Sequence, residues 1–231
     1  MISTSSQSAD SPSNAIDWRH RARVMLRSNP VFELYDRVRT RKAVRRWQLG
    51  ERTGPAPARL KQGLLTDTAK RHGLRHLVET GTFLGGMIRA QLPYFDRIDS
   101  IELDADLAHM ARWRFRNRPS VAIHAGDSAT VLPRLLAHLG EPALFWLDAH
   151  YSGGVTARAT AETPVLAEIR LVLMHAFGAR HVVLVDDARC FDGSHDYPTL
   201  EDVRKLVSQV RSEHIILVED DVIRIHAPLE A

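Results

Sequence analysis

The stretch HLVETGTFLGG, residues 76–86, decides the fold of this chain. Its first residues, His76–Glu79, predict a short strand, and a helix is expected to run through Met87–Gln91. A strand that passes through a glycine turn into a helix is the mononucleotide-binding half of a doubly wound α/β sheet. We therefore expect Gly81 to adopt a positive φ, and the Gly85-Gly86 pair to leave room for a ligand at the start of the helix.

Four further strand-and-helix units follow in the sequence, and a hairpin closes it. The strands expected at Ala143–Leu147 and His181–Val185 are almost wholly apolar, which is typical of strands covered by helices on both faces. Residues 214–226, HIILVEDDVIRIH, contain two β-branched runs split by acids, a pattern that predicts the terminal hairpin. The other expected strands are Arg97–Glu102 and Val121–His124, and the other expected helices are Leu60–His72, Ala105–Arg116, Ala129–Leu139, Thr163–Phe177 and Thr199–Arg211. The sequence thus predicts an α/β protein with a seven-stranded sheet.

The chain divides into three parts by composition. Residues 1–15 are Ser-rich and predict disorder, residues 16–59 predict a basic helical arm with a linker, and residues 60–231 form the main domain. Residues 1–62 hold 13 Lys and Arg against 5 Asp and Glu, a net charge of +8, whereas the remaining residues carry −5. A nucleic-acid footprint over the whole domain is therefore not supported.

The arm has three interpretations. Its apolar stripe could pack on the domain or on a second subunit, as in a homo-oligomer; its aromatic and basic residues could lie on an anionic membrane surface; or its charge could contact RNA. No apolar run in the sequence reaches the roughly 20 residues that span a membrane. The one cysteine, Cys190, has no partner for an internal disulfide. We expect a cytoplasmic protein, with peripheral membrane contact as an option.

The order of these elements, together with the acid-x-Gly-x-x-x-Gly pattern of Glu79–Gly85, resembles the class I S-adenosylmethionine-dependent methyltransferases. The resemblance covers Leu60 to the C-terminus, about three quarters of the chain. It implies a Rossmann-like, mostly parallel sheet of seven strands whose last strand is antiparallel, and S-adenosyl-L-methionine as cofactor. The stretch lacks the GxGxxG pattern, which counts against a nicotinamide cofactor.

The resemblance also implies cofactor-binding residues at the carboxyl ends of the first strands. Glu102, 21 residues beyond Gly81, would accept hydrogen bonds from both ribose hydroxyls. Asp127 would contact the adenine amino group, although an Asp before a helix also serves as an N-cap, the role we expect for Asp104. The full set of expected cofactor-binding residues is Glu79, Gly81, Thr82, Phe83, Gly85, Glu102, Asp127, Ser128 and Asp148.

Three further acids follow the fourth and fifth strands. If these strands are neighbours, the carboxylates of Asp148, Asp186 and Asp187 converge, and Mg²⁺ or a similar hard cation would relieve their repulsion. The arrangement resembles metal-dependent O-methyltransferases of the catechol and macrocin types, the latter having an Asp-Asp pair after strand five. The motif Asp-Ala-His at 148–150 departs from their Asp-Gly-Asp. Asp148 and His150 are the candidate catalytic residues, with His150 as general base.

The sequence therefore predicts a methyltransferase that O-methylates a small molecule or a sugar or glycan hydroxyl, assisted by a divalent metal. No Asn/Asp-Pro-Pro-Tyr follows strand four and no cysteine occupies a nucleophile position, which argues against the adenine and cytosine C5 methyltransferases of DNA. Three alternatives stay open. One is an RNA methyltransferase that uses the basic arm, and another is a non-catalytic protein of this fold that docks through the arm. The third is a hydride-transfer enzyme, against which the missing GxGxxG pattern counts.

Overall fold

The computed structural model describes residues 40–52, 54–148, 164–194 and 197–229. The chain divides into two units, residues 1–42 and 43–231, and the sheet belongs to the second. The N-terminal segment expected to be disordered and most of the expected arm lie outside the described residues. In the second unit, Trp47 is buried and its indole N–H donates to Asp220 Oδ1 at 2.9 Å. No helix among the described residues is long and apolar enough to cross a membrane.

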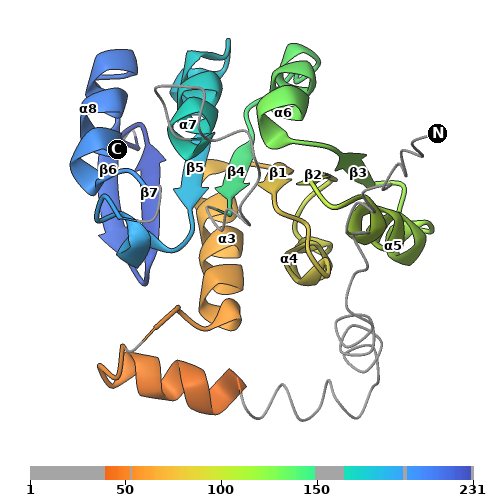
Figure 1. Cartoon of the computed structure of the whole chain (residues 1–231), viewed down its shortest axis with the longest axis horizontal. Coiled ribbons are helices and arrows are strands. Elements are labelled where there is room, and N and C mark those ends of the chain that lie inside the picture. Colours follow the sequence, from red (N-terminus) through yellow and green to blue (C-terminus); the bar gives the residue numbers. More distant parts are fainter. Residues whose placement is uncertain (1–39, 53, 149–163, 195–196, 230–231) are drawn as a thin grey trace, which may run out of the picture. The chain divides into compact units, whose positions relative to one another are not determined.

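Seven strands form one sheet in the order β3-β2-β1-β4-β5-β7-β6 (Figure 1). Strands β1 to β5 run parallel, and β7 pairs antiparallel with both β5 and β6. The strands are β1 (His76–Thr80), β2 (Arg97–Glu102), β3 (Val121–Ala125), β4 (Leu144–Leu147), β5 (Val182–Val185), β6 (Ile215–Glu219) and β7 (Val222–His226). This order confirms the predicted doubly wound sheet with its inserted antiparallel last strand.

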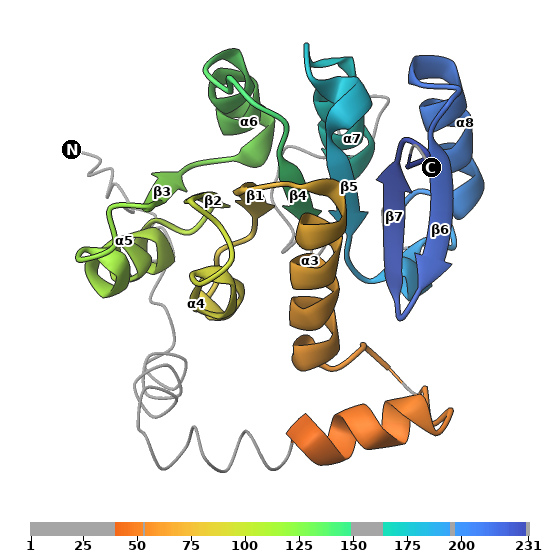
Figure 2. The same ribbon diagram turned by 180° about the vertical axis from the view of Figure 1, so that it is seen from behind.

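Helices cover both faces of the sheet (Figures 1 and 2). They are α3 (Ala58–His72), α4 (Gly86–Gln91), α5 (Ala105–Phe115), α6 (Ser128–Ala137), α7 (Pro164–Met174) and α8 (Leu200–Val210). Alternate strand residues pack into two cores: Val78 and Phe145 lie with α6, α7 and α8, whereas Leu77 and Trp146 lie with α3, α4 and α5. The continuous apolar strands are therefore explained by burial on both faces.

Strands β4 and β5 each begin one residue later than predicted. At the residue before each strand, the Ala143 N–H donates to Nδ1 of the His181 ring at 3.0 Å instead of to a backbone carbonyl, and the pairing of β4 with β5 begins only at Leu144 and Val182. Helix α7 also ends at Met174 instead of the predicted Phe177, because the Phe177 N–H donates to His175 Nδ1 and Leu173 O accepts from Arg211 Nε, so these two groups do not continue the helix. These differences involve side-chain and turn contacts that a hydrophobic pattern does not encode.

Residue 85 must be a glycine because a side chain there would clash with Phe115. It has φ +67°, and a Cβ there would lie 2.6 Å from Cε2 of Phe115, whereas a Cβ at Gly86 would meet nothing within 4 Å. We predict that Gly85→Ala lowers the free energy of unfolding by about 1–3 kcal/mol, while Gly86→Ala, the matched control at an open helical position, leaves it unchanged or raises it by up to about 1 kcal/mol. Denaturant titration of both variants measures the difference. Equal stabilities would contradict this reason for the glycine.

Candidate active site at the carboxyl ends of the strands

The glycine turn after β1 lies against the end of β4. Gly81 has φ +90°, as the sequence predicted, and a Cβ at this position would lie 3.1 Å from Cβ of Asp148. The N–H groups of Gly81 and Thr82 donate to Ile101 O at 2.9 and 3.2 Å, which fixes the turn to β2. A side chain at residue 81 is thus opposed both by the backbone conformation and by Asp148.

Glu102 ends β2 with its carboxylate held in place by the backbone. The Phe83 N–H donates to Oε2 at 2.7 Å, and the Asp104 N–H donates to Oε1 at 2.9 Å. Phe83 itself has a positive φ of 47°, which is uncommon for a residue with a side chain. The side chain of Asp104 caps α5, as predicted, by accepting from the N–H groups of Asp106 and Leu107. Each Glu102 oxygen keeps a second lone pair that could accept a ligand hydroxyl.

Glu79 lies in the sheet interior beneath this turn. Its Oε2 accepts from Ser100 Oγ at 2.6 Å, and Ser100 Oγ lies 2.6 Å from Thr82 Oγ1. Burial raises the pKa of Glu79 to about 8, helped by the charges of Asp148 and Glu102 and opposed by the Ser100 hydrogen bond. Glu79 therefore carries a proton at neutral pH and supports the turn from below. A direct contact of Glu79 or Thr82 with the cofactor stays a prediction.

Asp127 and Ser128 lie where β3 leads into α6. Asp127 is the N-cap of this helix, with its side chain accepting from the Ala129 N–H at 3.2 Å, which confirms the capping interpretation, while the adenine contact stays a prediction. Ser128 Oγ donates to Oε1 of Glu168, which is buried on α7. Burial and the charges of Asp127 and Asp148 raise the pKa of Glu168 to about 7. Glu168 was not predicted as a site residue, and its signal in the sequence is a single acid on the apolar face of α7.

The three aspartates predicted to converge do so. Strands β4 and β5 are parallel neighbours, and Asp148, Asp186 and Asp187 each offer a carboxylate oxygen within 4.8 Å of the others. Asp186 and Asp187 are buried, and Asp148 is half-buried. Asp187 has φ 57°, a strained conformation for a non-glycine residue that is typical of functional sites. The donor chemistry and spacing fit a hard divalent cation.

Lys61, which the sequence analysis did not single out, lies in this aspartate cluster. It extends from the first turn of α3, and its Nζ contacts Asp186 Oδ1 and lies 3.3 Å from Asp187 Oδ1. Burial alone would lower the pKa of Lys61, but the two carboxylates outweigh it and the pKa is raised. Burial raises the pKa of Asp186 to about 6 even though Lys61 opposes the shift. Both groups are therefore charged at pH 7.

Arg189 is a second cation beside the cluster. Its Nη1 donates to Asp187 Oδ1 at 2.6 Å and also to Asp221 Oδ2 in the turn between β6 and β7. The cluster is therefore bordered by a cation from α3 and a cation from the segment after β5. His150, the candidate base, lies outside the described residues.

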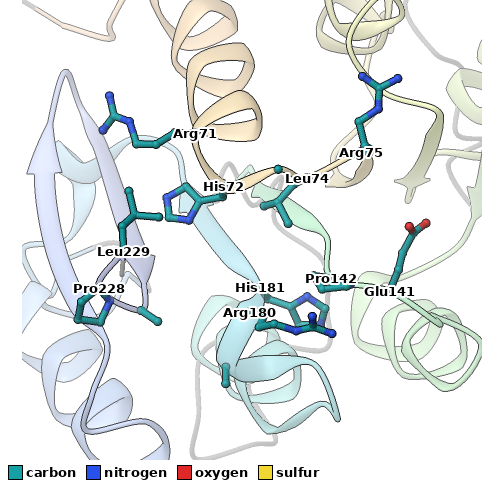
Figure 3. Close-up of a pocket in the computed structure, with 13 residues that line it drawn as sticks. Arg71, His72, Leu74, Arg75, Glu141, Pro142, Arg180, His181, Pro228 and Leu229 are labelled. Carbon is teal, nitrogen blue, oxygen red and sulfur yellow. The ribbon is translucent and has the colours of Figure 1, made fainter. Parts of the chain in front are cut away.

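Two pockets lie away from this site. One, of about 460 Å³, opens at the amino ends of β1, β4 and β5, and Figure 3 shows His72 and His181 on its wall. Burial lowers the pKa of His72 to about 4 and that of His181 to about 3, so both are neutral at pH 7. The other, of about 490 Å³, lies beside β3. Ligands of open α/β sheets bind at the carboxyl ends, so the candidate site is the cluster around Gly81 and Asp148.

No protein-family model and no curated protein matches the sequence. Solved structures match by fold. The methyltransferase PaMTH1 of Podospora anserina, bound to SAH, is 15% identical with a TM-score of 0.53, and the match covers 96% of this chain and all of that one. The O-methyltransferase TomG of Streptomyces achromogenes, from tomaymycin synthesis and bound to SAM, is 19% identical with a TM-score of 0.52 over 80% and 87% of the two chains.

An O-methyltransferase of Bacillus cereus in complex with SAH is 14% identical with a TM-score of 0.54, and the match covers 80% of this chain and 88% of that one. At these identities the likeness is one of fold. The chain has the class I methyltransferase fold, as its resemblance to that family implied.

Proposed function

We propose that this protein is an S-adenosylmethionine-dependent methyltransferase that methylates a hydroxyl oxygen of a small molecule or of a sugar or glycan. The observation that carries the proposal is that the glycine turn after β1 contacts both Glu102, at the end of β2, and Asp148, after β4. Gly81 packs against Asp148, and Asp148 belongs to the aspartate cluster. A cofactor seated on the turn would thus have its methyl group beside a group of carboxylates.

The cofactor-binding part of the proposal rests on Glu102. Its carboxylate is oriented by two backbone N–H groups, so little conformational entropy is lost when it accepts the ribose hydroxyls. Asp127 and Ser128, at the start of α6, would border the adenine. The absence of a side chain at Gly81 lets Asp148 lie against the turn on which the cofactor would be seated.

The acceptor-binding part rests on the aspartate cluster. Asp148, Asp186 and Asp187 would hold a divalent cation such as Mg²⁺, since their oxygens lie within 4.8 Å of one another. When bound, such an ion lowers the pKa of a coordinated hydroxyl. Asp148 would orient the acceptor beside the cofactor, and His150 would accept the hydroxyl proton. Oxygen acceptors fit this set because carboxylates and hard cations position hydroxyl groups.

Transfer of labelled methyl groups from S-adenosylmethionine to matched panels of hydroxyl-bearing and amine-bearing acceptors tests the proposal. We expect methylation of oxygen, with turnover reduced roughly a hundredfold in Asp148→Asn. The control is Asp106→Asn, an exposed acid in the first turn of α5. Methylation of amines alone, or equal turnover in Asp148→Asn and the wild type, would contradict oxygen transfer at this cluster.

A further inference from the structure

The aspartate cluster already holds a cation supplied by the protein. Lys61 is buried, although a lysine is seldom buried without a partner. The helix residues that share its buried face, Leu65 and Ala69, belong to the core, so α3 anchors the base of the lysine side chain. The ammonium group is therefore held in one position, where it contacts Asp186 and Asp187.

Both aspartates accept further hydrogen bonds, which fix their carboxylates in the positions that contact Lys61. Asp186 Oδ1 accepts the Asp187 N–H at 2.7 Å in addition to Lys61, and Asp187 Oδ1 accepts from Arg189 at 2.6 Å. Lys61 and Arg189 together bring two positive charges to a cluster of three carboxylates. Because Arg189 also pairs with Asp221, these side chains neutralise the cluster in part.

A divalent ion at the same carboxylates would compete with this arrangement. Such an ion lies about 2.0–2.6 Å from carboxylate oxygens, close to the positions that the ammonium group of Lys61 contacts. A divalent ion and the Lys61 ammonium group bound to the same carboxylates would repel each other strongly, because screening by water and salt is weak in a buried environment. The carboxylates therefore cannot bind the divalent ion and the Lys61 ammonium group tightly at the same time.

We propose that Lys61 is the resident cation of the cluster and that a divalent metal binds only by displacing it from Asp186 and Asp187. The inference rests on the metal-assisted reaction proposed above. It makes Lys61 the residue that sets the metal affinity of the site. The lysine keeps the buried aspartates neutralised while the metal is absent, and the metal releases the ammonium group when it binds.

Titration with Mn²⁺, followed by electron paramagnetic resonance, tests the competition directly. Lys61→Met should bind Mn²⁺ at least about tenfold more tightly than the wild type. Lys70→Met is the matched control, because it removes the same charge from an exposed position on the same helix, and it should bind as the wild type does. Unchanged or weaker Mn²⁺ binding by a folded Lys61→Met variant would overturn the inference.

A second measurement needs no variant, which matters because Lys61→Met leaves buried carboxylates unpaired and could destabilise the fold. Amine acetylation of the wild-type protein, read by peptide mass spectrometry, should find Lys61 protected without metal and reactive once Mn²⁺ saturates the site. Saturation with Lys61 still protected would overturn the inference. So would failure of both proteins to bind Mn²⁺ at all; if S-adenosylhomocysteine still bound, the methyltransferase proposal would survive that result.

Discussion

A Glu102→Ala variant should bind S-adenosylhomocysteine at least about a hundredfold more weakly than the wild type. The carboxylate lies at the end of β2 with only 7% of the residue exposed, and two backbone N–H groups set its orientation. Charge-assisted hydrogen bonds from both ribose hydroxyls would be lost together. The Phe83 and Asp104 N–H groups would also lose their acceptor, so the turn itself would loosen.

The control for this experiment is Asp106→Ala, an exposed acid four residues along the chain. It should bind the ligand as the wild type does, in calorimetry or by ligand-induced thermal stabilisation. A second variant, Glu102→Gln, keeps the acceptor oxygen and should lose less affinity than Glu102→Ala. If Glu102→Ala is folded and binds with wild-type affinity, the ribose assignment is wrong.

Replacing Glu79 with glutamine should stabilise the protein, by an amount that grows with pH. The folded state keeps the Glu79 proton up to a pKa of about 8, while the unfolded chain releases it above its ordinary value of 4.5. Between these values the folded state binds more protons than the unfolded state. The contribution of Glu79 to stability therefore falls as pH rises from 4.5 through 8, and glutamine removes that loss.

The difference in the free energy of unfolding between Glu79→Gln and the wild type should increase by on the order of 2–4 kcal/mol between pH 5 and pH 8.5. Glutamine keeps an oxygen that can accept from Ser100, so the hydrogen bond to β2 is retained. Denaturant titrations across this range measure the change, with Glu201→Gln on the exposed face of α8 as the control. Parallel pH profiles for Glu79→Gln and the wild type would show that Glu79 is not held protonated.

The sequence predicted the strands well because burial on both faces leaves a local pattern, and the resemblance to the class I methyltransferases implied their order in the sheet. The continuous apolar runs before Asp148 and Asp186 indicated two-sided burial, and the parallel pairing of β4 and β5 brought these acids together as expected. The positive φ of Gly81 followed from the strand-turn-helix pattern. For the buried strands and for Gly81, the deciding information lies within a few residues of the feature.

Lys61 and Glu168 were missed because their roles depend on partners far away in sequence. Lys61 meets Asp187 across 126 residues, and Ser128 meets Glu168 across 40. In the sequence each reads as a charged position on an amphipathic helix. Both are charged residues on the helix face that also carries the buried apolar residues. This pattern identifies a site residue only once the fold shows which polar groups lie next to it.

The central claim, that this fold binds S-adenosylmethionine at the glycine turn, is tested most directly by isothermal titration of S-adenosylhomocysteine into the wild-type protein. We predict one binding site per chain with a dissociation constant in the low micromolar range. No detectable binding by a folded sample would contradict the claim. That result would favour a function that depends on the basic arm.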